Sequence, residues 1–195
     1  PALEFKVWGA IQGGVDMLLL RAKDADLDSI RATLTRLRTA LGPSFPIIVN
    51  AGGRLPRLAQ ASGFHLPEDS VVSSPKAQIE KGQPDPATRK DKLLGISVHS
   101  PEAARAAEAL HPDYLLAGTI FSTDSHPRQP AGGIEHLKAI CSTTDIPVIA
   151  IGGIKPENAL ACIEAGAYGV AAMSPFQGAE RQQMAKAFKA ALKPR

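Results

Sequence analysis

Short apolar runs recur along the chain, and each is bounded by polar, glycine or proline residues. Runs of about four to eight residues that are rich in valine, isoleucine and leucine are typical of β-strands buried on both faces. This pattern predicts strands at Val15–Leu20, Pro46–Asn50, Gly63–Leu66, Leu93–His99, Tyr114–Thr119, Pro147–Gly152 and Gly169–Ser174.

The segments between these runs carry apolar residues at helical spacing. Ile30, Leu34 and Leu37, for example, are three or four residues apart and therefore share one helix face. This spacing predicts helices at Glu4–Gln12, Asp28–Leu41, Pro101–Leu110, Pro156–Ala165 and Gln177–Leu192. Strands that alternate with helices favour right-handed βαβ units, and therefore an α/β fold with one parallel sheet.

Length, composition and charge narrow the class of protein. A chain of 195 residues can bury a hydrophobic core without disulfides, and we expect residues 1–195 to form one domain. Two cysteines in helical segments favour a reducing compartment over a disulfide scaffold. The net charge of +3 and the aromatic content of 5% argue against a nucleic-acid partner. The apolar runs are too short to span a membrane, and the chain does not open with a signal peptide. We therefore expect a cytoplasmic protein without a membrane partner.

Polar and cationic side chains follow the predicted strands, where the active site of a parallel barrel lies. A phosphorylated substrate requires such groups to gather at one end of the sheet. The strand ends and the loops after them carry Arg21, Lys23, Asn50, His65, Glu68, Asp69, Ser97, His99, Thr119, Thr123, Ser125 and His126.

The last two strand-to-helix junctions predict a phosphate site. Gly152 and Gly153 precede a helix that starts near Pro156, and Met173 and Ser174 precede the last helix. Small residues let backbone N–H groups approach an anion, and the N-terminus of a helix favours negative charge. In barrels these two junctions commonly bind phosphate. The alternative interpretation is that the glycines only make a tight turn.

Two other features have both a functional and a structural interpretation. The polar loop 119–133 is either a lid that closes on substrate or a surface loop. Arg21 and Lys23 follow a buried strand, where cations need anionic partners. They either meet a phosphate or carboxylate of a ligand, or form ion pairs with a neighbouring carboxylate among Asp24, Asp26 and Glu68.

The histidines and carboxylates near the strand ends also leave alternatives open. His65 and His99 are either acid/base groups or hydrogen-bonded structural groups. The carboxylates of Glu68 and Asp69 are either ligands of Mg²⁺ or solvated side chains, and the solvated state is the more common one for a loop. Neither cysteine has the spacing of a metal ligand or a redox motif.

Several pieces of the sequence resemble the family of thiamine phosphate synthase and its sister enzyme, the thiazole tautomerase. The specific pieces are GISVHS (95–100), DYLLAGTIFSTDS (113–125), IPVIAIGGIKPENA (146–159) and EAGAYGVAAMS (164–174). Looser matches are GGVDMLLLRAKD (13–24) and PIIVNAGGRLPRLA (46–59). The resemblance implies a (β/α)₈ TIM barrel that handles a thiazole phosphate in thiamine biosynthesis. It also implies a first strand ahead of Glu4–Gln12, which we expect in a segment that precedes Pro1.

On the thiazole phosphate side, the residues match the family. The family's Thr-x-Thr motif corresponds to Thr123 and Ser125, a hydroxyl for a hydroxyl. Its phosphate-binding glycine corresponds to Gly153, and its Ile/Val-Ser pair corresponds to Met173 and Ser174. The resemblance therefore implies that these residues bind the phosphate of the thiazole.

On the side that binds the pyrimidine pyrophosphate and Mg²⁺ in the synthase, several residues depart from the family. Leu19 and Ala22 replace the Gln and Glu of a Gln-x-Arg-Glu-Lys motif. Ala51 replaces the Asp of an Asn-Asp pair that reaches Mg²⁺, and His126 replaces a lysine that binds pyrophosphate. Pro67 resembles the tautomerase branch. A pyrophosphate leaving group needs a metal or a cluster of cations, so these losses weaken the synthase interpretation.

Other residues of the same side remain. Arg21 and Lys23 keep the cations of the first motif, and Asn50 keeps the first member of the Asn-Asp pair. Ser97 corresponds to a pyrophosphate contact. The second Mg²⁺ aspartate of the family belongs to a stretch that corresponds to 65–69 here, one residue shorter than in the family. Asp69 is therefore a weak candidate for a metal ligand.

The departures favour a tautomerase-like isomerase of a thiazole carboxylate phosphate. Such an isomerase needs no cofactor, only a phosphate anchor, a carboxylate partner and one acid/base. Arg21 and Lys23 would face the carboxylate, and His126 is the candidate acid/base. The tautomerases use a histidine where this chain has Thr119, which we place among the substrate-binding residues instead.

Three alternatives stay open. The first is a thiamine phosphate synthase in which Mg²⁺ is completed by Asp69 and water. The second is a non-catalytic protein that binds thiazole phosphate or thiamine phosphate, and the third is an unrelated barrel enzyme that shares only the glycine turns. In each case the partner is a small molecule, and the sequence leaves open a homo-oligomer.

Overall fold

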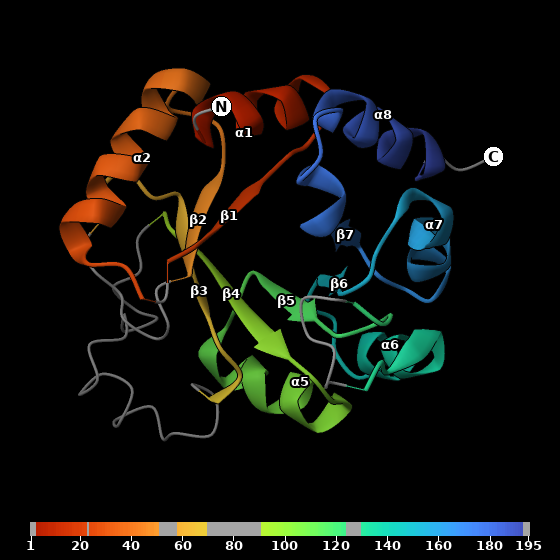
Figure 1. Ribbon diagram of the computed structural model, residues 1–195. Coiled ribbons are helices and arrows are strands. Elements are labelled where there is room, and N and C mark those ends of the chain that lie inside the picture. Colours follow the sequence, from red (N-terminus) through yellow and green to blue (C-terminus); the bar gives the residue numbers. More distant parts are fainter. Residues whose placement is uncertain (1–2, 23, 51–57, 70–90, 124–129, 193–195) are drawn as a thin grey trace.

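One curved sheet of seven parallel strands runs through the molecule, and each strand pairs with the next one along the chain (Figure 1). The structure is a computed structural model that describes residues 3–22, 24–50, 58–69, 91–123 and 130–192. The strands are β1 (Leu18–Arg21), β2 (Ile47–Asn50), β3 (Gly63–Leu66), β4 (Leu93–Val98), β5 (Tyr114–Ala117), β6 (Val148–Ile151) and β7 (Gly169–Ala171). The predicted α/β fold with one parallel sheet is therefore confirmed.

Each strand lies where an apolar run predicts it, although most strands are shorter than the run. β3 has the predicted bounds, whereas β5 ends at Ala117 rather than Thr119, and β6 ends at Ile151 rather than Gly152. Beyond these ends the chain turns out of the sheet at glycines. The trimmed residues belong to the loops that build the candidate site.

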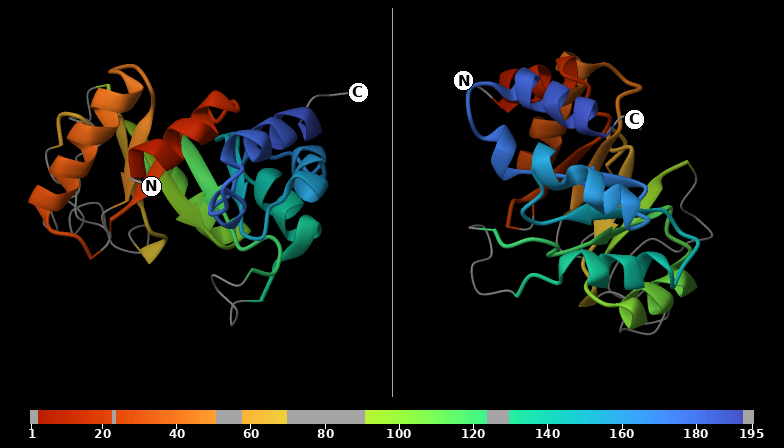
Figure 2. Two further views of the ribbon diagram at one scale, coloured as in Figure 1. Left: turned by 45° about the horizontal axis from the view of Figure 1, so that its top comes forward. Right: turned by 90° about the vertical axis from the view of Figure 1, so that its right-hand side faces the viewer.

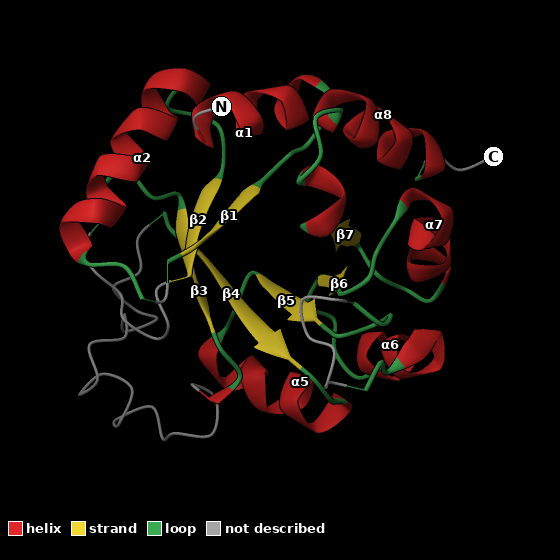
Figure 3. Ribbon diagram, viewed as in Figure 1, coloured by secondary structure: helices red, strands yellow, loops and turns green. Residues whose placement is uncertain are grey.

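Helices cover the outer face of the sheet (Figures 2 and 3). The α-helices are α1 (Leu3–Gln12), α2 (Leu27–Leu41), α5 (Pro101–Ala107), α6 (Gly133–Cys141), α7 (Pro156–Glu164) and α8 (Arg181–Ala191), with 3₁₀ turns η2 (Glu108–Leu110) and η3 (Ser174–Phe176). The sequence pattern did not predict α6, whose first residue is the second glycine of the pair Gly132 and Gly133. In the described part of the chain, every helix is too short or too polar to cross a membrane.

The sheet stays open between β7 and β1, so the closed (β/α)₈ barrel is not observed among the described residues. The ring of helices does close on that side, because α1 packs against both α8 and α2. Glu4 of α1 pairs with Arg36 of α2 at 2.6 Å, and Asp16, after α1, pairs with Lys189 of α8 at 2.8 Å. The described fold is a curved sheet inside a ring of helices, and the strand expected ahead of α1 stays a prediction.

The hydrophobic core fills the space between the sheet and the helices. Leu34 and Leu37 of α2 pack against Ile47 and Val49 of β2 in one cluster. A second cluster joins strands β4 to β6 with α5 to α8. Full burial of each such side chain stabilises the fold by about 1.5–3 kcal/mol. The apolar spacing of the sequence therefore identifies the faces that the helices present to the sheet.

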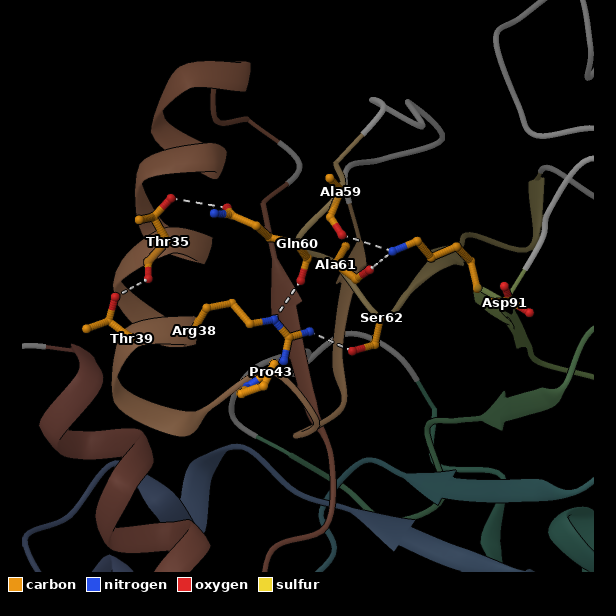
Figure 4. A pocket seen from close by; sticks show the side chains of 10 residues that line it. Thr35, Arg38, Thr39, Pro43, Ala59, Gln60, Ala61, Ser62 and Asp91 are labelled. Carbon is orange, nitrogen blue, oxygen red and sulfur yellow. Dashed lines mark hydrogen bonds between the residues drawn. The ribbon is translucent and has the colours of Figure 1, made fainter.

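Arg38 joins α2 to the amino-terminal ends of the neighbouring strands (Figure 4). Its guanidinium donates to the carbonyl of Gln60 at 2.7 Å, to the carbonyl of Phe45 at 2.5 Å and to the Ser62 hydroxyl at 2.7 Å. The Ser62 oxygen also accepts from the backbone N–H of Ile47 at 3.0 Å. One cation thus satisfies acceptors in the segments that lead into both β2 and β3.

We predict that Arg38→Ala lowers the free energy of unfolding by about 2–4 kcal/mol, because these three acceptors and the Gly42 carbonyl lose a charged donor. Urea denaturation followed by circular dichroism measures the change. Arg31→Ala is the matched control, since Arg31 forms an exposed pair with Asp28 at 3.2 Å and its loss costs about 0.5 kcal/mol or less. Equal losses in the two variants would contradict this role of Arg38.

Candidate functional site

The parallel sheet brings the carboxyl ends of all its strands to one end of the molecule, as a strand-end site requires. Arg21, the last residue of β1, is the register partner of Asn50, the last residue of β2. Asn50 is buried, whereas Arg21 is exposed. Two of the predicted site residues therefore lie side by side at the strand ends.

Two of the carboxylates expected as structural partners of Arg21 are engaged elsewhere. Asp26 caps α2 by accepting from the Ser29 N–H at 2.9 Å, and the hydrogen bonds from Ser29 lower the pKa of Asp26. Glu68 pairs with His99. Within the described ranges Arg21 forms no ion pair, which favours its interpretation as a ligand-binding cation. Lys23 lies outside the described residues.

Gly152 and Gly153 form a turn that only glycine accommodates readily. Their φ angles are +100° and +62°, which lie in the left-handed region. A Cβ atom on Gly153 would lie 2.5 Å from the Ser122 carbonyl oxygen, and one on Gly152 would lie 2.6 Å from the Thr119 methyl carbon. The turn is thus constrained both by its backbone conformation and by the loop after β5, which presses against it.

Backbone hydrogen bonds hold these two loops together beyond the sheet. The N–H groups of Ile120 and Phe121 donate to the carbonyls of Ile151 and Gly152 at 3.0 and 2.9 Å. The two ends of the predicted lid lie close together, because the Gly132 N–H donates to the Thr119 carbonyl at 2.9 Å. Residues 124–129, which include the predicted Ser125 and His126, lie outside the described residues. The lid interpretation therefore stays a prediction.

The predicted phosphate anchor has backbone donors available. Among the described residues, the N–H groups of Gly153 and Ser174 donate to no acceptor. Ser174 begins the 3₁₀ turn η3, directly after Met173, and a ligand is one of the partners that satisfy the first N–H groups of a helix. Asn158, which the sequence reasoning missed, braces the turn through its amide, which donates to the Gly153 carbonyl at 3.1 Å.

His65 takes part in a buried chain of hydrogen bonds, as its structural interpretation predicts. Its side chain is 1% exposed. Nδ1 lies 3.1 Å from the Tyr114 hydroxyl, and Nε2 lies 2.8 Å from the Ser97 hydroxyl. Sequence reasoning missed Tyr114, because its contact with His65 joins residues 49 positions apart and no local pattern indicates it.

The carboxylates after β3 do not form a preformed metal site. Glu68 pairs with His99 Nδ1, and the His99 carbonyl accepts from His136 Nε2 at 2.8 Å. Asp69, the weak candidate for a metal ligand, is the other carboxylate of this segment. Within the described ranges no three histidine, cysteine, aspartate or glutamate side chains converge as metal ligands would.

A hollow under α2 lies at the opposite end of the strands from these residues (Figure 4). It is lined by the cations Arg38 and Lys92. Lys92 Nζ donates to the carbonyls of Ala59 and Ala61, just as Arg38 donates to neighbouring acceptors. Because both cations already donate to carbonyls of neighbouring segments, they join structural elements, and we assign no ligand to the hollow.

The family model and the sequence relatives agree on one family. The family model described as thiamine monophosphate synthase matches residues 3–176. A thiamine-phosphate synthase from Natronomonas pharaonis is 36% identical over 179 residues, covering 89% of this chain and 79% of that protein. One from Moorella thermoacetica is 35% identical over 189 residues, covering 92% and 82%. A solved thiamine phosphate pyrophosphorylase from Pyrococcus furiosus superposes with a TM-score of 0.78 at 24% identity, covering 98% of this chain and 89% of that one, which shows a shared fold.

We predict that Gly153→Ala weakens the binding of inorganic phosphate about tenfold or more, a change that corresponds to about 1.4 kcal/mol. The added Cβ must displace the Ser122 carbonyl and sits on a left-handed backbone, so the Gly153 N–H moves. Titration followed by NMR measures the affinity. Gly178→Ala is the control, since a Cβ there meets nothing within 4 Å. Unchanged binding by Gly153→Ala would remove Gly153 from the anchor.

Proposed function

Because the chain belongs to the thiamine monophosphate synthase family, we propose that it is a thiamine phosphate synthase. In this reaction the ring nitrogen of a thiazole phosphate forms a bond to the methylene carbon of a hydroxymethylpyrimidine pyrophosphate. The bond from that carbon to oxygen breaks, and pyrophosphate leaves with the electron pair. The proposal rests on the identity of about a third over most of the chain to relatives that bear the synthase name. The departures from the synthase motifs favour the tautomerase. These relatives favour the synthase instead.

The loops after β6 and β7 would hold the thiazole phosphate. The N–H groups of Gly153 and Ser174 are unengaged by the described residues, and both lie at junctions that lead into helical turns. The Ser174 hydroxyl and Met173 would complete this anchor, with Thr123 approaching from the loop after β5. An anchored phosphate orients the thiazole for attack, which is the main contribution of such a binding group.

The ends of β1, β2 and β4 would hold the pyrophosphate half. Arg21 has no ion pair with the described residues, and Asn50 is its register partner. Ser97 lies on β4 with its hydroxyl at the end of the buried His65 chain. A cation and two neutral polar groups would together stabilise the charge that develops on the leaving oxygen.

Mg²⁺, which the family implies, does not find a complete donor set among the residues that the structure describes. Glu68 is paired with His99, and Ala51 stands where the family's metal-binding pair has its Asp. Asp69 alone does not make a preformed site.

An isomerase of a thiazole carboxylate phosphate is the second candidate. Arg21 forms no ion pair with the described residues, and Leu19, Ala22 and Ala51 replace polar residues of the synthase motifs. Both observations favour the isomerase, because a carboxylate needs one cation and no metal. Thr119 provides no imidazole at the position of the tautomerase acid/base, so His126 or water would have to move the proton.

We also propose that residues 1–195 act as one domain. The helices α1 and α8, from opposite ends of the chain, pack against each other, which supports this proposal. Small-molecule substrates fit the weak net charge of +3 better than a nucleic acid does.

The decisive assay supplies both substrates with and without Mg²⁺ and measures thiamine phosphate and released pyrophosphate. We expect coupling. A parallel reaction with the thiazole carboxylate phosphate alone, followed by NMR, tests isomerisation. Isomerisation without coupling would replace the synthase by the second candidate. Tight binding of thiamine phosphate with neither reaction would make the chain a non-catalytic binding protein.

We predict that Ser174→Ala raises the KM for thiazole phosphate about tenfold, since a hydrogen bond to a charged group contributes about 1.5–3 kcal/mol. Steady-state kinetics of coupling measures the change. Ser142→Ala is the control, because the Ser142 hydroxyl donates to the Ala139 carbonyl on the exposed surface of the molecule. A KM for Ser174→Ala equal to that of the control would place the phosphate elsewhere.

A further inference from the structure

Three side chains from adjacent strands form a hydrogen-bonded chain through the interior of the sheet. Tyr114 is the first residue of β5, His65 lies in β3, and Ser97 lies near the carboxyl end of β4, between the other two strands. Tyr114 and His65 are buried, and their rings stack with centroids 5.7 Å apart. The chain thus leads from a buried hydroxyl to the partly exposed hydroxyl of Ser97.

Gly95 of β4 makes this chain sterically feasible. A Cβ at Gly95 would overlap the Tyr114 phenol and would lie 2.6 Å from His65 Nδ1. The Tyr114 ring therefore crosses β4 at the position of the missing side chain and reaches β3. The glycine is needed here for space, since its φ angle is not positive.

The partners of Tyr114 decide which histidine nitrogen carries the proton. Burial, with a smaller contribution from Asp113, raises the pKa of Tyr114, so the phenol keeps its proton. Among the described residues, the hydroxyl has one hydrogen-bond partner, His65 Nδ1. A buried O–H without an acceptor costs about 1–3 kcal/mol. Nδ1 must therefore accept, which leaves the single proton of a neutral imidazole on Nε2.

We propose that Tyr114 is a positioning residue that fixes His65 in the tautomer donating to Ser97. Because Ser97 Oγ then accepts from Nε2–H at 2.8 Å, its own proton is free to point toward the carboxyl ends of the strands. There it donates to an anionic oxygen of the pyrophosphate group, a step that rests on the proposed function. In the opposite tautomer, Ser97 would donate to His65 and present only lone pairs to the anion.

The tautomer is measured without substrate. In protein with ¹⁵N-labelled histidine, two-bond correlations between ring nitrogens and ring protons show which nitrogen is protonated. We expect His65 to be protonated on Nε2 alone in the wild type. In Tyr114→Phe we expect a mixture of the two tautomers. A His65 ring protonated on Nδ1 in the wild type would overturn the proposal, whatever reaction the protein catalyses.

A double-mutant cycle tests whether Tyr114 acts through Ser97. The affinity for inorganic pyrophosphate is measured by calorimetry for the wild type, Tyr114→Phe, Ser97→Ala and the double variant. We expect Tyr114→Phe to weaken binding several-fold when Ser97 is present and to have no effect in the Ser97→Ala background. Equal weakening in both backgrounds would reduce Tyr114 to a structural role. Tyr168→Phe, at a side chain that is 80% exposed, is the matched control.

Two further outcomes are informative. If Tyr114→Phe does not fold, His65→Gln and His65→Leu make the same test, since the glutamine amide can still donate to Ser97 and the leucine cannot. Pyrophosphate affinity should then survive in the first variant and fall in the second. A wild type that shows the Nε2 tautomer but binds no pyrophosphate would overturn the ligand assignment and leave the tautomer standing.

Discussion

The close approach of the loop after β5 to the glycine turn after β6 is the constraint on which the candidate site depends. Two successive residues with positive φ carry the chain from β6 toward α7, and carbonyls of the neighbouring loop occupy the space beside them. Any side chain at Gly153 would separate the two loops. Because the loops stay together, Gly153 lies beside the carbonyls of Phe121 and Ser122, the two residues that precede Thr123.

Polar groups inside the curved sheet obey a second constraint, since each must find a partner where water is excluded. Asn50 and His65 are the buried polar residues of the described chain. His65 meets its requirement through Tyr114 on one side and Ser97 on the other. A hydrogen-bonding need of the interior therefore also orients a group at the ligand end, which links the stability of the fold to the chemistry of the site.

Local patterns predict the elements of this fold well, and long-range contacts explain what they miss. The apolar run of β3 has the bounds of the strand, whereas the runs at β5 and β6 continue into loops that are joined by backbone hydrogen bonds beyond the sheet. The glycine turn and Ser174 stand out in the sequence because small residues and a hydroxyl after a strand are typical of a phosphate anchor. Tyr114 and the engagement of Glu68 by His99 depend on partners distant in the chain, which no periodicity reveals. The resemblance predicted the family correctly. The finer preference for the tautomerase rested on single substitutions, whereas the similarity of the whole chain to its relatives favours the synthase.

The central claim is that the last two strand-to-helix junctions bind the phosphate of a thiazole. A crystal structure of the protein soaked with thiamine phosphate tests it most directly. The account predicts the phosphate within hydrogen-bond distance of the Gly153 and Ser174 N–H groups, with the pyrimidine directed toward Ser97. A phosphate bound elsewhere, for example in the hollow beside Arg38, or no ligand at these junctions at saturating concentration, would contradict it.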